Sequence, residues 1–159
     1  MRIVASLLGL LAGLSQASIG ATRGSEEAVF EAVVVAKLRD FRAAARANAS
    51  EPSVFCLAIN PGEAPQTPSR EFLARFKDQL DVRPAGQCEA RRNRVVEIGG
   101  ARRALLLTVG PVEWVSGDEA WVTVTVQIDH PYPLPATYRV VKEREGWSAL
   151  GPMMKIAPA

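Results

Sequence analysis

The sequence predicts one α+β domain, in which two N-terminal helices pack on a curved antiparallel meander sheet. Two observations support this prediction. Apolar residues recur at helical spacing in the first half of the chain, whereas from about Val95 they alternate with polar residues, as in strands with one solvated face. Behind its leader the chain keeps roughly 140 residues, which suffices for one hydrophobic core and is too short for two.

The first seventeen residues have the three parts of a secretory signal. Arg2 gives a positive start, Ile3–Leu14 is an apolar run too short to span a bilayer, and Ser15-Gln16-Ala17 fits signal peptidase. We therefore expect a signal peptide over residues 1–17, a single domain over residues 18–159, and export to the periplasm or the medium. A bacterial lipoprotein carries its lipid on a cysteine at the end of the leader, and this leader has no cysteine there. No later segment is long enough for a transmembrane anchor.

The helices are expected in the first part of the domain. Ser25-Glu26-Glu27 is typical of a helix start, so a helix is predicted over about residues 26–46. Its apolar stripe consists of Phe30, Val34, Leu38, Phe41 and Ala45. Val54–Ile59 follows as a short buried strand. A second helix is predicted from Thr67-Pro68 to just before Pro84. Its buried edge consists of Phe72, Leu73, Phe76 and Leu80.

The strands of the meander follow from the alternation. They are expected at Ala104–Val109, Val112–Val115, Ala120–Ile128, Thr137–Lys142 and Trp147–Leu150, with a last short one near Met153–Ile156. A bulge or kink is expected at Gly110-Pro111, between the first two. In the clearest strand the valines face one side and Trp121 faces the other, so the second face of the sheet is also expected to be covered.

Cys56 and Cys88 are the two cysteines of the chain. In an oxidising compartment an isolated pair of thiols usually forms a disulfide, and this one would close a loop of about 33 residues. Two free buried cysteines are the alternative. A metal site is not expected, because no histidine lies between the cysteines to complete a ligand shell.

The order of elements resembles the NTF2-like and cystatin-like folds, in which a long helix lies in the hollow of a bent sheet. More narrowly, it is similar to small exported bacterial proteins of uncharacterised function. The matching features are Phe55-Cys56-Leu57-Ala58-Ile59, Phe72-Leu73-Ala74-Arg75-Phe76, Cys88, Gly110-Pro111-Val112-Glu113-Trp114, Tyr138-Arg139-Val140-Val141 and Gly146-Trp147. These are packing and turn signatures, so the resemblance implies a scaffold and carries no functional residue with it.

A cluster of arginines is the most unusual local feature. Its members are Arg91, Arg92, Arg94, Arg102 and Arg103, five arginines within thirteen residues. Only Glu97 opposes them within the segment, and a hairpin tip at Gly99-Gly100 would bring the two ends of the segment together. Such a patch suits an anionic polymer, a lipid phosphate surface or an acidic partner. An ordinary solvated hairpin is the alternative.

Nucleic acid is not the expected partner. Without Arg2 the chain carries 18 basic and 17 acidic residues, a net charge of +1, which provides no general attraction for a polyanion. The arginine cluster also lacks the interleaved aromatic residues on which single-stranded bases stack.

No set of residues predicts catalysis. His130, the only histidine, follows Asp129 but precedes a proline and has no nucleophile motif near it, so an exposed loop histidine is expected. Asp40 and Glu113 are the acids that would serve as proton carriers if either faced a cavity. We predict no catalytic residue, no metal and no cofactor.

The sequence thus favours an exported, disulfide-stabilised binding or interaction module without catalytic activity. The alternative is an NTF2-like small-pocket enzyme or ligand-binding protein, which needs an open cavity between the first helix and the sheet. An envelope-protein partner or a homodimer, formed through the face that carries Trp121, is a further possibility.

Overall fold

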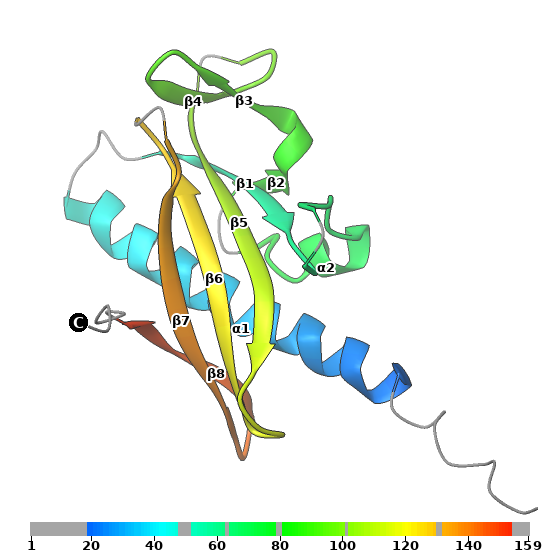
Figure 1. Cartoon of the computed structure of the whole chain (residues 1–159). Helices are drawn as coiled ribbons and strands as arrows, with labels where there is room; N and C mark the ends of the chain where they lie inside the picture. Colours follow the sequence, from blue (N-terminus) through cyan, green and yellow to red (C-terminus); the bar gives the residue numbers. More distant parts are fainter. Residues whose placement is uncertain are drawn as a thin grey trace, which may run out of the picture.

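The computed structural model describes residues 19–47, 52–62, 64–78, 81–100, 102–129 and 132–153, so the predicted signal peptide lies outside the described residues. In this part of the chain one long helix crosses one face of an eight-stranded sheet (Figure 1). The helices are α1 (Ile19–Ala47) and the short α2 (Arg70–Ala74). The strands are β1 (Val54–Ile59), β2 (Asp81–Pro84), β3 (Cys88–Arg91), β4 (Arg94–Glu97), β5 (Arg103–Trp114), β6 (Glu119–Gln127), β7 (Leu134–Glu143) and β8 (Gly146–Met153).

The sheet is mixed, and this corrects the predicted all-antiparallel meander. Its order is β2-β1-β5-β6-β7-β8, and β4 pairs with the start of β5 and with β3. Strands β5 to β8 form the predicted antiparallel meander. Strand β1, however, lies parallel to both β2 and β5. Parallel neighbours need a crossover connection, and the segment that contains α2 provides it between β1 and β2.

The prediction of two N-terminal helices holds for the first and fails for most of the second. Helix α1 covers the predicted residues 26–46 and begins earlier, at Ile19. Helix α2 has only five residues, and it begins after Ser69, whose Oγ accepts a hydrogen bond of 3.1 Å from the N–H of Phe72. Strand β2 takes residues 81–83, which were expected at the end of the helix, because the backbone of this segment pairs with the edge of β1. Long-range pairing therefore overrides the helical spacing.

Strand β5 contains the predicted bulge. Its pairing with β6 shifts register between Val109 and Val112. Gly110 has a φ of +108°, and a Cβ at this position would collide with the backbone carbonyl of Asn60. A side chain at this position is therefore excluded by both backbone conformation and space. Strand β8 differs slightly from the prediction, since it runs without interruption to Met153, and Met154–Ile156 lies outside the described residues.

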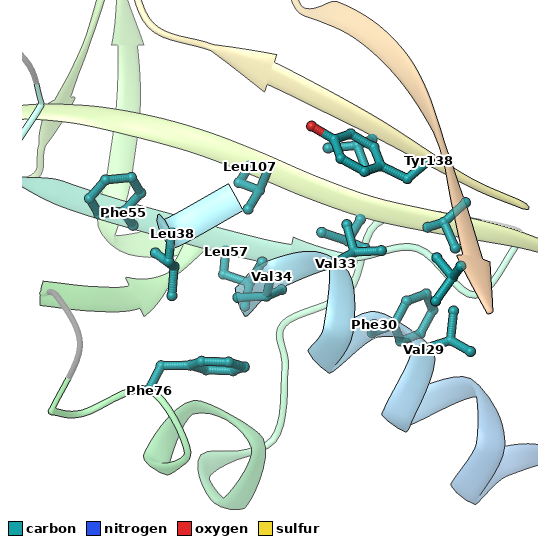
Figure 2. Packing of buried hydrophobic residues seen from close by; sticks show 14 of the residues in the cluster. Val29, Phe30, Val33, Val34, Leu38, Phe55, Leu57, Phe76, Leu107 and Tyr138 are labelled. Atoms are coloured by element: carbon teal, nitrogen blue, oxygen red, sulfur yellow. The ribbon is translucent and has the colours of Figure 1, made fainter. Parts of the chain in front are cut away.

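The sheet separates two hydrophobic clusters, and its strands alternate between them. The larger cluster, which we call the main core, fills the space between α1 and the sheet (Figure 2). The smaller cluster, which we call the small core, lies on the opposite face. Strand β1 sends Phe55 and Leu57 into the main core, and Val54 and Cys56 into the small core. This is the period of two that a strand buried on both faces requires.

The small core lies under the β3–β4 hairpin. Its buried members are Val54, Cys56, Val95 and Ala104, with Cys88 and Leu106 packed against them. The hairpin thus covers the second face of the sheet at the end where β1, β4 and β5 meet (Figure 1).

Candidate anion-binding hairpin

Strands β3 and β4 form a tight hairpin at the end of the molecule far from the β7–β8 turn (Figure 1). Its register pairs Arg91 with Arg94, so Arg92 and Asn93 alone form the turn. Arg92 adopts the left-handed conformation, with a φ of 50°. This conformation is uncommon for a residue other than glycine, asparagine or aspartate. Three arginines therefore lie in or directly beside one two-residue turn, and the one within the turn has a strained backbone.

The base of this hairpin is held by the disulfide that the sequence predicted. Cys56 in β1 and Cys88 in β3 are bonded, with their Cα atoms 6.0 Å apart, and the described residues include no free cysteine. The bond joins the hairpin to a central strand of the sheet. Val95 of β4, which is buried, packs in the same small core. The hairpin is thus fixed at its base while its turn remains exposed.

A network of four charged side chains lies beside the disulfide. In the strand register Arg83 is the partner of Cys56 and Glu97 is the partner of Cys88. Arg102 donates hydrogen bonds to Asp81 at 2.6 Å and to both carboxylate oxygens of Glu97 at 2.9 Å. The Nε of Arg83 lies 3.0 Å from Asp81 and 3.1 Å from Glu97. Two arginines and two carboxylates therefore neutralise one another at the base of the hairpin.

The network shifts the pKa values of three of its members, Asp81, Glu97 and Arg102. Burial opposes the ionisation of Asp81, but the hydrogen bonds from Arg102 and Arg83 outweigh it and hold the pKa of Asp81 below its usual 3.8. The hydrogen bond from Arg102 likewise lowers the pKa of Glu97 below 4.5. The same bonds raise the pKa of Arg102, that to Glu97 most. Asp81, Glu97 and Arg102 are thus charged at neutral pH.

The structure divides the five predicted arginines into two groups. Arg91, Arg92 and Arg94 line one shallow cavity of about 690 Å³, together with Asn93 and Asp129. We call these five residues the arginine tip. Arg103 reaches it indirectly, since it pairs with Asp129. Arg102 does not belong to it, because Asp81 and Glu97 neutralise it.

The predicted turn at Gly99-Gly100 is present, between β4 and β5, but it does not bring the five predicted arginines together in one patch. Asp81 and Asp129, which bind Arg102 and Arg103, are 21 and 26 residues away from them in the chain. Reasoning on the segment alone therefore missed these two acids. Glu89, which pairs with Arg91, lies two residues away and could have been noticed as a local partner.

The charge of the arginine tip is not balanced. Arg91 pairs with Glu89, and Arg103 pairs with Asp129. Within the described residues Arg92 and Arg94 have no acidic partner. Together with Arg103, the three arginines of the arginine tip face two carboxylates, those of Glu89 and Asp129, which leaves two positive charges uncompensated beside the cavity. A site of this kind attracts an oxyanion.

The acids considered for catalysis do not face the space between α1 and the sheet. Asp40 and Glu113 are both exposed. That space is filled by Phe30, Val34 and Leu38, all at most 4% exposed (Figure 2). The ring of Phe41 packs against that of Phe55 in a tilted arrangement, with ring centroids 5.3 Å apart. In the described part of the chain no polar or charged residue is buried. His130 lies outside the described residues.

Among the residues with described positions, no group of three or more His, Cys, Asp or Glu side chains is placed to hold a metal ion. None of the described helices has the length and apolar character to cross a membrane. Comparison with protein-family models, with curated proteins and with solved structures finds no match.

Proposed function

We propose that this protein is an exported binding module that holds oxyanion groups of its ligand at the arginine tip. The observation that supports the proposal most directly is the turn itself. Arg92 occupies a left-handed backbone position between Arg91 and Arg94, which face each other across the hairpin. Like charges directly opposite in a hairpin destabilise it, and so does a positive φ at a residue that carries a Cβ. An anion bound between the guanidinium groups would offset this cost.

The chemistry of the site suits carboxylate or phosphate groups. A guanidinium group presents a planar set of donors that matches both oxyanions, and its charge-assisted hydrogen bonds are among the stronger ones in proteins. The cavity at the arginine tip is shallow and lined by polar side chains. It suits an anionic group at the end or along the side of a larger ligand, rather than a small molecule enclosed on all sides.

Export and fold are parts of the same proposal. The disulfide between Cys56 and Cys88 supports an oxidising compartment, since such bonds rarely persist in the cytosol. A long helix lying across one face of a sheet that ends in an antiparallel meander supports an NTF2-like or cystatin-like arrangement. We assign no catalytic step to this chain.

A titration with two polyanions tests the proposal. The probes are polyphosphate and polyglutamate, and calorimetry measures the binding of each at low salt and at about 0.15 M salt. The variant is Arg92→Gly, which removes the charge and relieves the positive φ. We expect its affinity for the better probe to fall at least about tenfold, as the loss of a charge-assisted hydrogen bond implies. Its free energy of unfolding should stay the same or rise.

Arg144→Gly is the matched control. Arg144 is an exposed arginine in the turn of the β7–β8 hairpin, at the opposite end of the molecule (Figure 1). Its removal should leave binding unchanged. Equal losses for the two variants would show a general charge effect and would remove the arginine tip from the function. Absence of binding by the parent protein to both probes would do the same.

A further inference from the structure

The outer side of α1 carries two cavities that form one continuous surface. The first, of about 380 Å³, lies between α1 and the start of β8, and the second, of about 550 Å³, continues along the C-terminal half of the helix. Val35 and Arg39 line both. The side chain of Val35 lies 40% exposed at the point where the cavities meet, although the neighbouring Val34 is buried in the main core. We call this surface the α1 groove.

The α1 groove is acidic at one end and basic at the other. Glu31 and Glu145 line the first cavity, near the N-terminal half of the helix. Arg39, Arg42 and Arg46 line the second. These three arginines make no ion pair with any residue whose position is described. One Glu31 oxygen is bound by Arg75 at 2.6 Å, so the other oxygen can still accept a hydrogen bond.

From this arrangement we infer that the α1 groove is the site at which a second copy of this chain docks, with the two α1 helices antiparallel about a twofold axis at Val35. A twofold interface must be complementary to itself, so an acidic end must meet a basic end. The α1 groove has this property. A partner of one charge sign would be complementary to only half of it.

The helix register makes the inference specific. In an antiparallel pair centred on Val35, residues whose numbers add up to 70 lie opposite each other. Glu31 then faces Arg39 of the second copy, and Ala28 faces Arg42 of the second copy. Glu145 lines the same cavity as Ala28, so this Arg42 lies within its reach. Ala28 and Ala32 line the floor of the first cavity and allow the helix axes to come close. Val35 meets its symmetry mate and excludes water at the centre.

Crosslinking and sedimentation test the inference. In Val35→Cys the two thiols meet at the twofold axis, so mild oxidation should give a disulfide-linked dimer in high yield. The described cysteines of the parent protein are already paired with each other. Ala43→Cys is the matched control, because Ala43 is exposed on the same groove but lies eight residues from the axis. Its two copies would be about 24 Å apart along the helices, and it should not crosslink.

Arg39→Glu should weaken self-association at least about tenfold in sedimentation equilibrium, since it places two acids opposite each other at each end. Arg92→Glu, at the arginine tip, should leave self-association unchanged. This contrast keeps the dimer separate from anion binding. The inference is overturned if the parent protein is a monomer at all accessible concentrations, if the two cysteine variants crosslink equally, or if association survives Arg39→Glu.

Discussion

The main core and the small core lie on opposite faces of the same strands and are held together by different means. The main core contains seventeen buried residues from α1, the α2 segment and strands β1, β5, β6 and β7, and no disulfide crosslinks its described residues. The small core contains four buried residues and has the disulfide, with the network of Asp81, Arg83, Glu97 and Arg102 beside it. Burial of seventeen side chains removes enough apolar surface from water to hold α1 on the sheet without a crosslink, whereas burial of four does not suffice for the hairpin.

The difference shows how this chain covers both faces of one sheet. A long helix covers one face through apolar burial. A hairpin of two four-residue strands covers part of the other, where a disulfide and ion pairs replace most of the apolar area. The cost of ordering so short a hairpin is lowered by a crosslink to a central strand. The exposed turn is thereby held in place without being buried.

The largest expected effect comes from two neighbouring leucines in β5. Leu107 is 1% exposed and belongs to the main core, whereas Leu106 is half-buried and packs against the small core. We expect Leu107→Ala to lower the free energy of unfolding by about 3–5 kcal/mol and Leu106→Ala by about 1–2 kcal/mol. Urea denaturation measures both. Because the strand and the substitution are the same, the difference reports on how completely each leucine is buried and packed on its own face of the sheet.

Equal losses for the two variants would contradict the comparison. Such a result would mean that the small core is packed as completely as the main core. A larger loss for Leu106→Ala would make the disulfide side the principal source of stability.

The second prediction removes the covalent bond. We expect Cys56→Ala/Cys88→Ala to lower the free energy of unfolding by about 3–4 kcal/mol, as the chain-entropy model gives for a loop of about 33 residues. The loss should be uneven: amide hydrogens of β3 and β4 should exchange much faster, while those of β6 and β7 follow the global stability. Reduction of the parent protein by dithiothreitol is the control and should reproduce the effect. Uniform acceleration across the sheet would refute separate stabilisation of the hairpin.

The sequence predicts well those parts of the fold that local periodicity determines. Alternation in β6 places Val122 and Val124 in the main core, where both are fully buried. The spacing of Phe30, Val34 and Leu38 predicts the buried face of α1, and the lone pair of cysteines predicts the disulfide. Each of these follows from contacts that repeat along one element or from the chemistry of one residue type.

Features that depend on distant pairing were not predicted. Residues 81–83 continue a plausible helix in sequence, but Val82 pairs with Phe55 and belongs to a parallel strand. Arg102 and Arg103 read as part of one basic patch until the sheet brings Asp81 and Asp129 beside them. The three arginines of the arginine tip were therefore named from the sequence, but Asn93, Asp129 and the separation of Arg102 from the cavity were not, because ion pairs between distant segments leave no local pattern.

The smallest expected effect concerns the charged network. It should make the stability of the small-core side of the sheet depend on pH more than that of the main-core side. Arg102 and Arg83 hold the pKa of Asp81 below 3.8 in the folded state, and Arg102 holds that of Glu97 below 4.5. A depressed folded-state pKa stabilises the fold above the unfolded-state value and loses this contribution as the pH falls through the folded-state value. Stability should therefore decline below about pH 4, where unfolded carboxyl groups take up protons.

Because Asp81 and Glu97 are only partly buried, the decline should be modest and should diminish at high salt. Amides of β3 and β4, beside the network, should show it before those of β7. Asp81→Asn should flatten this acid response, whereas Glu113→Gln, which alters an exposed acid on β5 outside the network, should leave it intact. If Asp81→Asn retained the full acid response, the network would not contribute to the small-core side. The disulfide and four buried side chains would then suffice to hold the hairpin against the sheet.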